Sequence, residues 1–104
     1  MKLQERIILF SELGNQIKSE IDHENFESIL YNAKSKNGWF TFDNLKLAIN
    51  NIIEQFLDKP KLEHFTNQYS SEYFNPLEPK NVGIIAAGNI PLVGFQDLLY
   101  VILS

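Results

Sequence analysis

Asn89 is the residue whose type and setting point most directly to chemistry. It follows a short apolar run that ends in the small residues Ala86, Ala87 and Gly88, and Pro91 comes shortly after it. An asparagine at the carboxyl end of a buried strand, ahead of a helix, lies where α/β proteins bind ligands. The two N–H donors of its amide suit a developing oxyanion. Alternatively, the amide only satisfies backbone groups of the turn, and the residues alone leave both interpretations open.

Other side chains that could do chemistry do not form a pattern. His23 and His64 are far apart and match no metal-ligand spacing, so we expect both to be exposed to solvent. The carboxylates are scattered, and most lie at expected helix starts or on solvent faces. The chain has no cysteine, which excludes disulfides, thiolate zinc sites and a cysteine nucleophile within these residues. We therefore predict no metal site.

Nucleotide and nucleic-acid motifs are also missing. The spacing of Gly83, Gly88 and Gly94 matches neither the dinucleotide-binding fingerprint nor the P-loop. The stretch from Lys34 to Phe40 mixes cations with aromatics, but two lysines are too few for a groove that follows phosphates. We expect the aromatic side chains here to join one helix to the next: Trp39, Phe40 and Phe42.

Length and composition indicate one ordinary globular domain. The chain has 104 residues, of which 44% are hydrophobic, and its net charge of -4 makes a nucleic-acid or anionic membrane surface an improbable partner. The first residues lack the apolar core of a signal peptide, so we predict a cytoplasmic protein. The longest charge-free part of the tail, residues 82–96, is shorter than the ~20 residues that span a bilayer. We therefore predict no membrane partner.

Apolar spacing predicts about four helices in the first 70 residues. The first runs from Leu3 to Ile21, and the second, capped by Asp22, ends near Asn37–Gly38 with the glycine in the left-handed conformation. Thr41 offers an N-cap for the third helix, and Pro60 closes that helix and suits the first turn of the fourth. The apolar stripes on these helices are Leu3, Ile7, Phe10, Leu13, Ile17 and Ile21; Phe26, Ile29, Leu30 and Ala33; Leu45, Ala48, Ile49, Ile52, Ile53 and Phe56; and Leu62, Phe65 and Tyr69.

The remainder of the chain changes character. Residues 71–81 contain two prolines and are predicted to be an extended linker. Beyond it the only charged residue is Asp97, and the apolar run 82–87 is typical of a strand buried on both faces. A tight turn and a helix from Phe95 to Leu103 follow. The predicted fold is mainly α: a helical region (1–70), the linker, and one strand and a helix (82–104) that begin an α/β Rossmann-like cofactor domain.

A strand with two apolar faces needs neighbouring strands, and none is predicted within these residues. We therefore expect the chain to be the N-terminal piece of a longer protein. We also expect residues 82–103 to self-associate or to fold back over the helices. An alternative interpretation is a small helical interaction module whose apolar tail docks on a partner.

The segment from Pro79 to Leu99, with its Gly-Asn-Ile-Pro-Leu-Val-Gly-Phe run, resembles the acyl-CoA reductases related to the LuxC fatty-acid reductase component of bacterial luminescence. These enzymes belong to the aldehyde dehydrogenase superfamily. The likeness extends upstream to residues 37–44, where Trp39-Phe40-Thr41 is similar to the start of a helix in one branch of these reductases. It covers essentially the whole chain, but only the N-terminal part of the family.

The resemblance implies reduction of an acyl-CoA, or a related acyl thioester, to an aldehyde by NADPH or NADH through a cysteine thioester. Asn89 matches the asparagine that helps to hold the oxyanion. Ala86, Ala87 and Gly88 match the segment beside the nicotinamide, although the superfamily often has Pro-Trp where this chain has Ala87-Gly88. The nucleophilic cysteine has no counterpart here. The chain alone is therefore expected to bind no cofactor and to be inactive.

Overall fold

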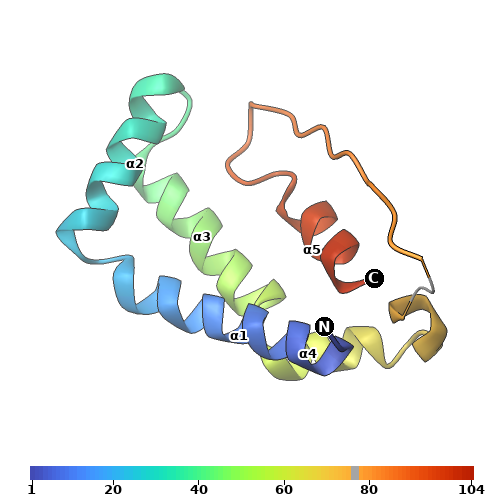
Figure 1. Cartoon of the computed structure of the whole chain (residues 1–104). Coiled ribbons are helices and arrows are strands. Elements are labelled where there is room, and N and C mark those ends of the chain that lie inside the picture. Colours follow the sequence, from blue (N-terminus) through green and yellow to red (C-terminus); the bar gives the residue numbers. More distant parts are fainter. Residues whose placement is uncertain (76–77) are drawn as a thin grey trace.

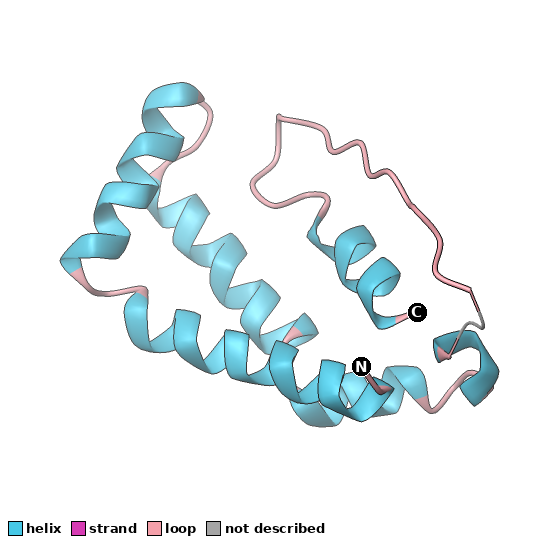
Figure 2. Ribbon diagram, in the orientation of Figure 1, coloured by secondary structure: helices cyan, strands magenta, loops and turns pink. Residues whose placement is uncertain are grey.

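The computed structural model describes residues 1–75 and 78–104 and is built from helices. Figure 1 shows their order along the chain, and Figure 2 shows the helices and the loops between them. The elements are α1 (Leu3–Glu20), α2 (Glu24–Lys36), α3 (Phe42–Phe56), α4 (Lys59–Thr66), the short 3₁₀ helix η1 (Ser71–Phe74) and α5 (Phe95–Leu103). The predicted mainly helical character is thus confirmed for the described residues.

The helix boundaries follow local capping chemistry. Thr41 Oγ1 accepts a hydrogen bond from the backbone N–H of Asn44 (3.1 Å), as expected for an N-cap. Asp58 caps α4 in the same way, through the N–H of Lys61 (3.2 Å), and Pro60 lies in the first turn. The predicted Asp22 cap is wrong. His23 takes the N-cap position of α2 without a side-chain bond, and Asp22 instead lies 3.4 Å from Lys46 Nζ.

Gly38 does not adopt the left-handed conformation predicted for it. Helix α2 does end where expected, at Lys36, but no glycine in the described residues has a positive φ. Asn37 is extended at the end of the helix, and its backbone N–H donates to the carbonyl of Ala33 (3.1 Å). The chain therefore leaves α2 in an extended conformation, and the end of this helix does not require a glycine.

Residues 82–87 form no strand, so this prediction is wrong for the described residues. They run as an exposed, extended segment that loops away from the helices and returns to α5 (Figure 1). Strand structure requires a hydrogen-bonded neighbour, and the described residues offer none. The linker prediction also needs correction, because Ser71–Phe74 is a 3₁₀ helix and Phe74 is buried. Pro76, one of the two prolines on which it rested, lies outside the described residues.

The core lies where α1, α4 and α5 meet. Four side chains form its centre: Ile7, Leu62, Leu99 and Leu103. Two of them come from α5, so the helix predicted to begin a separate domain packs into the helical region. The radius of gyration is 15.3 Å, larger than the ~13 Å of a compact 100-residue domain, which agrees with the looped-out segment between η1 and α5.

Gly14 is required where α1 crosses the end of α3. A Cβ placed on Gly14 would lie 2.7 Å from Leu57 Cβ and 3.2 Å from the Leu57 carbonyl oxygen. Glycine-to-alanine in a helix normally stabilises by up to about 1 kcal/mol. Here we expect Gly14→Ala to lower the free energy of unfolding by about 1–3 kcal/mol, because the added methyl forces the helices apart.

Urea denaturation followed by circular dichroism measures this effect. The matched control is Gly38→Ala, since nothing lies within 4 Å of a Cβ at that position. The Gly38→Ala control should change the urea midpoint of unfolding little. A Gly14→Ala chain as stable as the parent would mean that α1 and Leu57 are not in close contact.

Candidate functional site

The segment that contains Asn89 folds into a loop over an apolar hollow of about 470 Å³. The hollow is lined mainly by residues between 84 and 98, together with Phe40 from the loop before α3. Ala86, Ala87 and Gly88 are among the lining residues, and Asn89 lies directly beside them in the chain and is exposed. The four residues singled out from the sequence thus lie on one exposed loop.

Two close contacts define the shape of this loop. A Cβ on Gly94 would lie 2.8 Å from Ala86 Cβ, so the two ends of the loop approach closely and only glycine fits at this position without a shift. Asn37 reaches across from the end of α2 and donates its Nδ2–H to the Gly88 carbonyl (2.7 Å), while its Oδ1 accepts from the N–H of Trp39 (3.0 Å). Asn37 therefore ties the loop to the α2–α3 connection.

Leu92 has a φ of 57°, a conformation that costs a non-glycine residue about 1–2 kcal/mol. Its side chain is half exposed, so the burial of this side chain offsets little of the conformational cost. Strain of this kind is concentrated at functional sites and turns that the surrounding structure holds in place. The 86–94 loop is thus strained, closely packed across its neck and anchored by Asn37.

The side chain of Asn89 forms no hydrogen bond with the described residues. The one loop carbonyl that a side-chain amide satisfies is that of Gly88, and Asn37 supplies the amide. The alternative role of Asn89 was to satisfy backbone groups of the turn. Asn37, which was not predicted to have this role, satisfies the turn carbonyl instead. The Asn37–Gly38 pair is a turn signal in the sequence, but its contact with Gly88, far along the chain, has no sequence signature.

The aromatic stretch before α3 is arranged only partly as predicted. Phe42 does join two helices: its ring stacks on Tyr31 of α2 at a centroid distance of 6.3 Å, and Lys34 Nζ lies 4.9 Å above it. Trp39 does not, since 86% of its surface is exposed.

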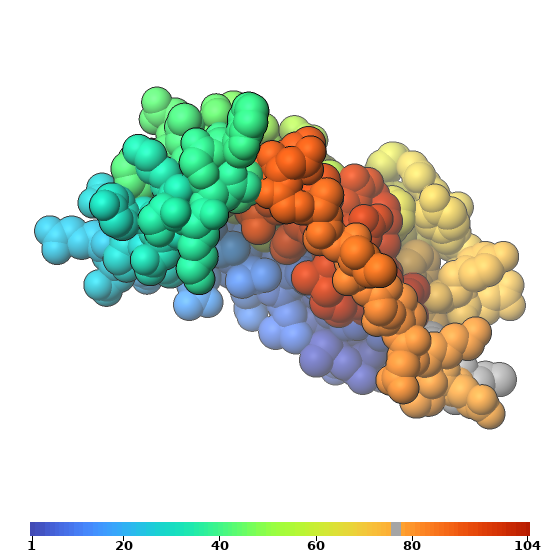
Figure 3. Space-filling model, turned by 90° about the horizontal axis from the view of Figure 1, so that it is seen from above, coloured from blue at the N-terminus to red at the C-terminus, as the bar shows by residue number. Residues whose placement is uncertain are grey.

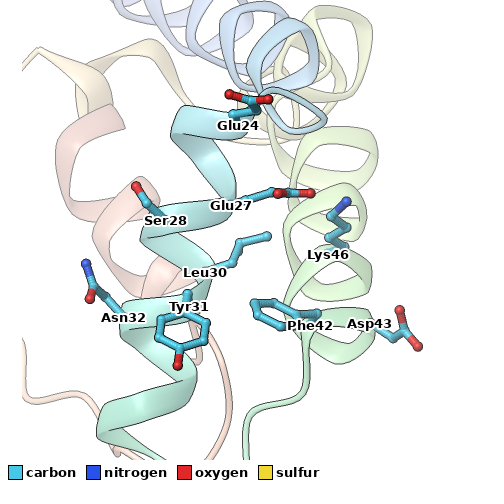
Figure 4. A pocket seen from close by; sticks show the side chains of 9 residues that line it. All are labelled: Glu24, Glu27, Ser28, Leu30, Tyr31, Asn32, Phe42, Asp43 and Lys46. Atoms are coloured by element: carbon cyan, nitrogen blue, oxygen red, sulfur yellow. The ribbon is translucent and has the colours of Figure 1, made fainter.

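A groove of about 590 Å³ between α2 and α3 gathers several of the carboxylates (Figure 4). Its apolar floor comes from Leu30, Tyr31 and Phe42, and its rim carries Glu24 and Asp43, which are exposed as predicted. No group of three or more potential metal ligands occurs within the described residues. Both histidines are exposed, also as predicted.

Helices capable of crossing a bilayer are missing from residues 1–75 and 78–104, because each is too short or too polar. Comparison with known proteins adds no assignment: the chain matches no protein-family model, no curated protein and no solved structure.

Proposed function

We propose that this chain forms the N-terminal part of an NAD(P)H-dependent acyl-CoA reductase. In this reaction hydride adds to the carbonyl carbon of an acyl thioester, the carbon–sulfur bond breaks, and the aldehyde leaves while the released thiolate takes up a proton. Residues 1–75 and α5 make up a helical base, and residues 82–94 carry the part of the site that this chain contributes. The family resemblance of residues 79–99 suggests the reaction.

The main support for the proposal is that apolar side chains of residues 82–94 are exposed and that much of this segment lacks backbone hydrogen bonds. The segment has no charged residue, yet Ile85 is fully exposed and more than half of the surface of Val82 and Ile90 is exposed. No backbone–backbone hydrogen bond involves residues 78–91 within the described chain. Within it, residues 82–87 are extended, uncharged and without backbone partners, which is what a strand looks like without its sheet. A larger α/β domain would supply the missing neighbours.

Asn89 is proposed to stabilise the oxyanion that forms at the acyl carbonyl. Its amide is exposed and free of bonds to the described residues, so its two N–H donors are available. Ala86, Ala87 and Gly88 are proposed to lie against the nicotinamide of the cofactor. They suit a flat ring because their side chains are small and nothing lies within 4 Å of a Cβ at Gly88. When bound, the reduced nicotinamide supplies the hydride.

The proposal requires a thiol from outside these residues, because the chain has no cysteine. Sequencing the gene through and beyond codon 104 tests this requirement at once. We expect an open reading frame that continues into alternating strands and helices and encodes a cysteine. A stop codon directly after Ser104 would contradict the reductase proposal.

A helical interaction module with an apolar docking tail is the second candidate. It is favoured by the packing of α5, whose Leu99 and Leu103 complete the core of the helical region. The described residues thereby form a hydrophobic core of their own. On this hypothesis the exposed loop would contact a partner protein and Asn89 would have no role in a reaction.

Of the two outcomes expected for residues 82–103, α5 folds back onto the helices, and we propose that the exposed residues before it make the isolated chain self-associate. Exposed apolar strand edges find partners, and Ile85 is the most exposed apolar side chain of the loop. We expect the chain to sediment as a dimer or larger species and Ile85→Lys to shift it to the monomer. Ile29→Lys, on the exposed face of α2, is the control. Equal association of all three chains would rule out the loop as the interface.

A further inference from the structure

Asn37, at the end of α2, uses both its backbone and its side-chain polar groups. Its backbone N–H donates to the Ala33 carbonyl (3.1 Å), and its backbone carbonyl accepts from the N–H of Phe40 (3.0 Å). Its Oδ1 accepts from the N–H of Trp39 (3.0 Å), and its Nδ2–H donates to the Gly88 carbonyl (2.7 Å). Three of these partners are local, whereas Gly88 is 51 positions away. The local bonds therefore fix Asn37 independently of the loop.

The local bonds also determine which way the side-chain amide faces. The oxygen and the nitrogen of an asparagine amide are distinguished by the groups that surround them. The backbone N–H of Trp39 requires the amide oxygen, and this turns the amide nitrogen toward Gly88. The donor is thus oriented in advance, so little side-chain entropy is lost when it binds the Gly88 carbonyl.

The bond from Asn37 holds a segment that has no other polar attachment. Within residues 1–75 and 78–104, it is the one hydrogen bond that joins residues 82–91 to the rest of the chain. Figure 3 shows this orange segment against the green end of α2. Phe40, from the same connection, lines the hollow under the loop. Because Leu92 has a φ of 57°, the loop needs such attachments to keep its conformation.

The bond to the Gly88 carbonyl also orients Asn89. The peptide unit between the two residues is trans and planar, so the Gly88 C=O and the Asn89 N–H point in opposite directions. While Asn37 holds the carbonyl, this plane cannot rotate freely. The Asn89 side chain therefore starts from a Cα whose place relative to α2 is fixed.

We propose that Asn37 is the latch of the Asn89 loop: its amide holds the Gly88–Asn89 peptide on the helices, and in the complete protein it is a positioning residue for Asn89. Asn37 acts only through the Gly88 carbonyl. The holding of the loop is a property of these 104 residues, whereas the effect on catalysis rests on the proposed reductase function.

Two variants remove the latch and keep the local bonds: Asn37→Asp and Asn37→Ser. In both, a side-chain oxygen can still accept from the N–H of Trp39. An ionised aspartate has no donor for Gly88, and serine is too short to reach it. We expect the ratio of latched to released loop to fall roughly 3- to 10-fold in both variants, the usual effect of losing one hydrogen bond.

NMR of the isolated chain measures this ratio. In both Asn37 variants, the backbone amide signals of residues 86–94 should move toward those of an unstructured chain, while the signals of α1 to α4 stay in place. Spectra at two protein concentrations identify any effect of self-association. Asn32→Asp and Asn32→Ser make the same changes at an exposed position of α2 and should leave the loop signals unchanged.

Three results would overturn the latch. The first is an unchanged loop in both Asn37 variants, and the second is an equal change in the Asn32 controls. The third is a change in Asn37→Asp alone, which would be an effect of charge and not of the missing donor.

Kinetics of the complete protein test the positioning role. Both Asn37 variants should lower kcat roughly 3- to 10-fold, in step with the loss of latched loop, and leave the KM for the acyl-CoA unchanged. A released loop with the parent kcat would overturn the positioning role. A complete parent protein without reductase activity would contradict the proposed function, and the NMR result would still decide whether Asn37 holds the loop.

Discussion

If the complete protein is the reductase that we propose, replacing Asn89 with alanine is expected to lower kcat about 100- to 1000-fold, the usual cost of removing one oxyanion donor. The loss belongs to the transition state, because charge develops on the acyl oxygen only as the carbon is attacked. The affinity for the cofactor and the melting temperature should change little. Asn89 forms no hydrogen bond with the described residues, so its removal breaks no contact that stabilises the loop.

The control is Asn81→Ala, which removes an exposed amide from the same segment. It should leave kcat unchanged. Steady-state kinetics and thermal unfolding on both variants separate catalysis from folding. An Asn89→Ala enzyme with normal kcat and a lowered melting temperature would contradict the oxyanion role. It would show that the amide stabilises the turn in the intact protein.

Leu99→Ala should remove about 2–5 kcal/mol from the free energy of unfolding of the chain. Leu99 is 1% exposed and lies in the core with Ile7 and Leu62, so its truncation leaves a cavity among three helices. Total stabilities are only about 5–15 kcal/mol, so this loss would remove a large part of the free energy of unfolding.

The neighbouring Leu98 provides the comparison, because it is 43% exposed. Leu98→Ala should change the stability by much less than Leu99→Ala in urea denaturation. If both variants are equally stable, α5 is not part of the core of the helical region. The C-terminal residues would then form a separate unit, as the sequence predicted.

The helices could be predicted because their signals are local. Apolar residues spaced every three or four positions identified α1 to α4, and Thr41 and Pro60 marked helix starts through contacts within one turn. The amount of burial could not be predicted in the same way. Ile29 lies on the apolar stripe of α2 yet is 58% exposed, because no element among the described residues covers that side of the helix.

The features that the sequence did not predict depend on partners that are distant or absent. Residues 82–87 have the composition of a strand but lack a neighbouring strand within the described chain. The anchoring of Gly88 by Asn37 joins residues that are far apart in the sequence. The same is true of the hydrogen bond from Arg6 to the Phe74 carbonyl, which joins α1 to the end of η1. The spacing of apolar residues along the sequence indicates helices, but it does not indicate contacts between residues that are far apart in the chain.

The most direct test of the reductase proposal is to incubate the protein encoded by the complete reading frame with a series of acyl-CoAs, from short-chain to long-chain, and NADPH or NADH. Aldehyde and free CoA are measured together with the oxidation of the nicotinamide. We expect one aldehyde and one free thiol for each acyl-CoA consumed. The isolated 104-residue chain, which lacks a cysteine, should form none. Aldehyde formation by the isolated chain, or none by a folded complete protein with either cofactor, would contradict the assignment.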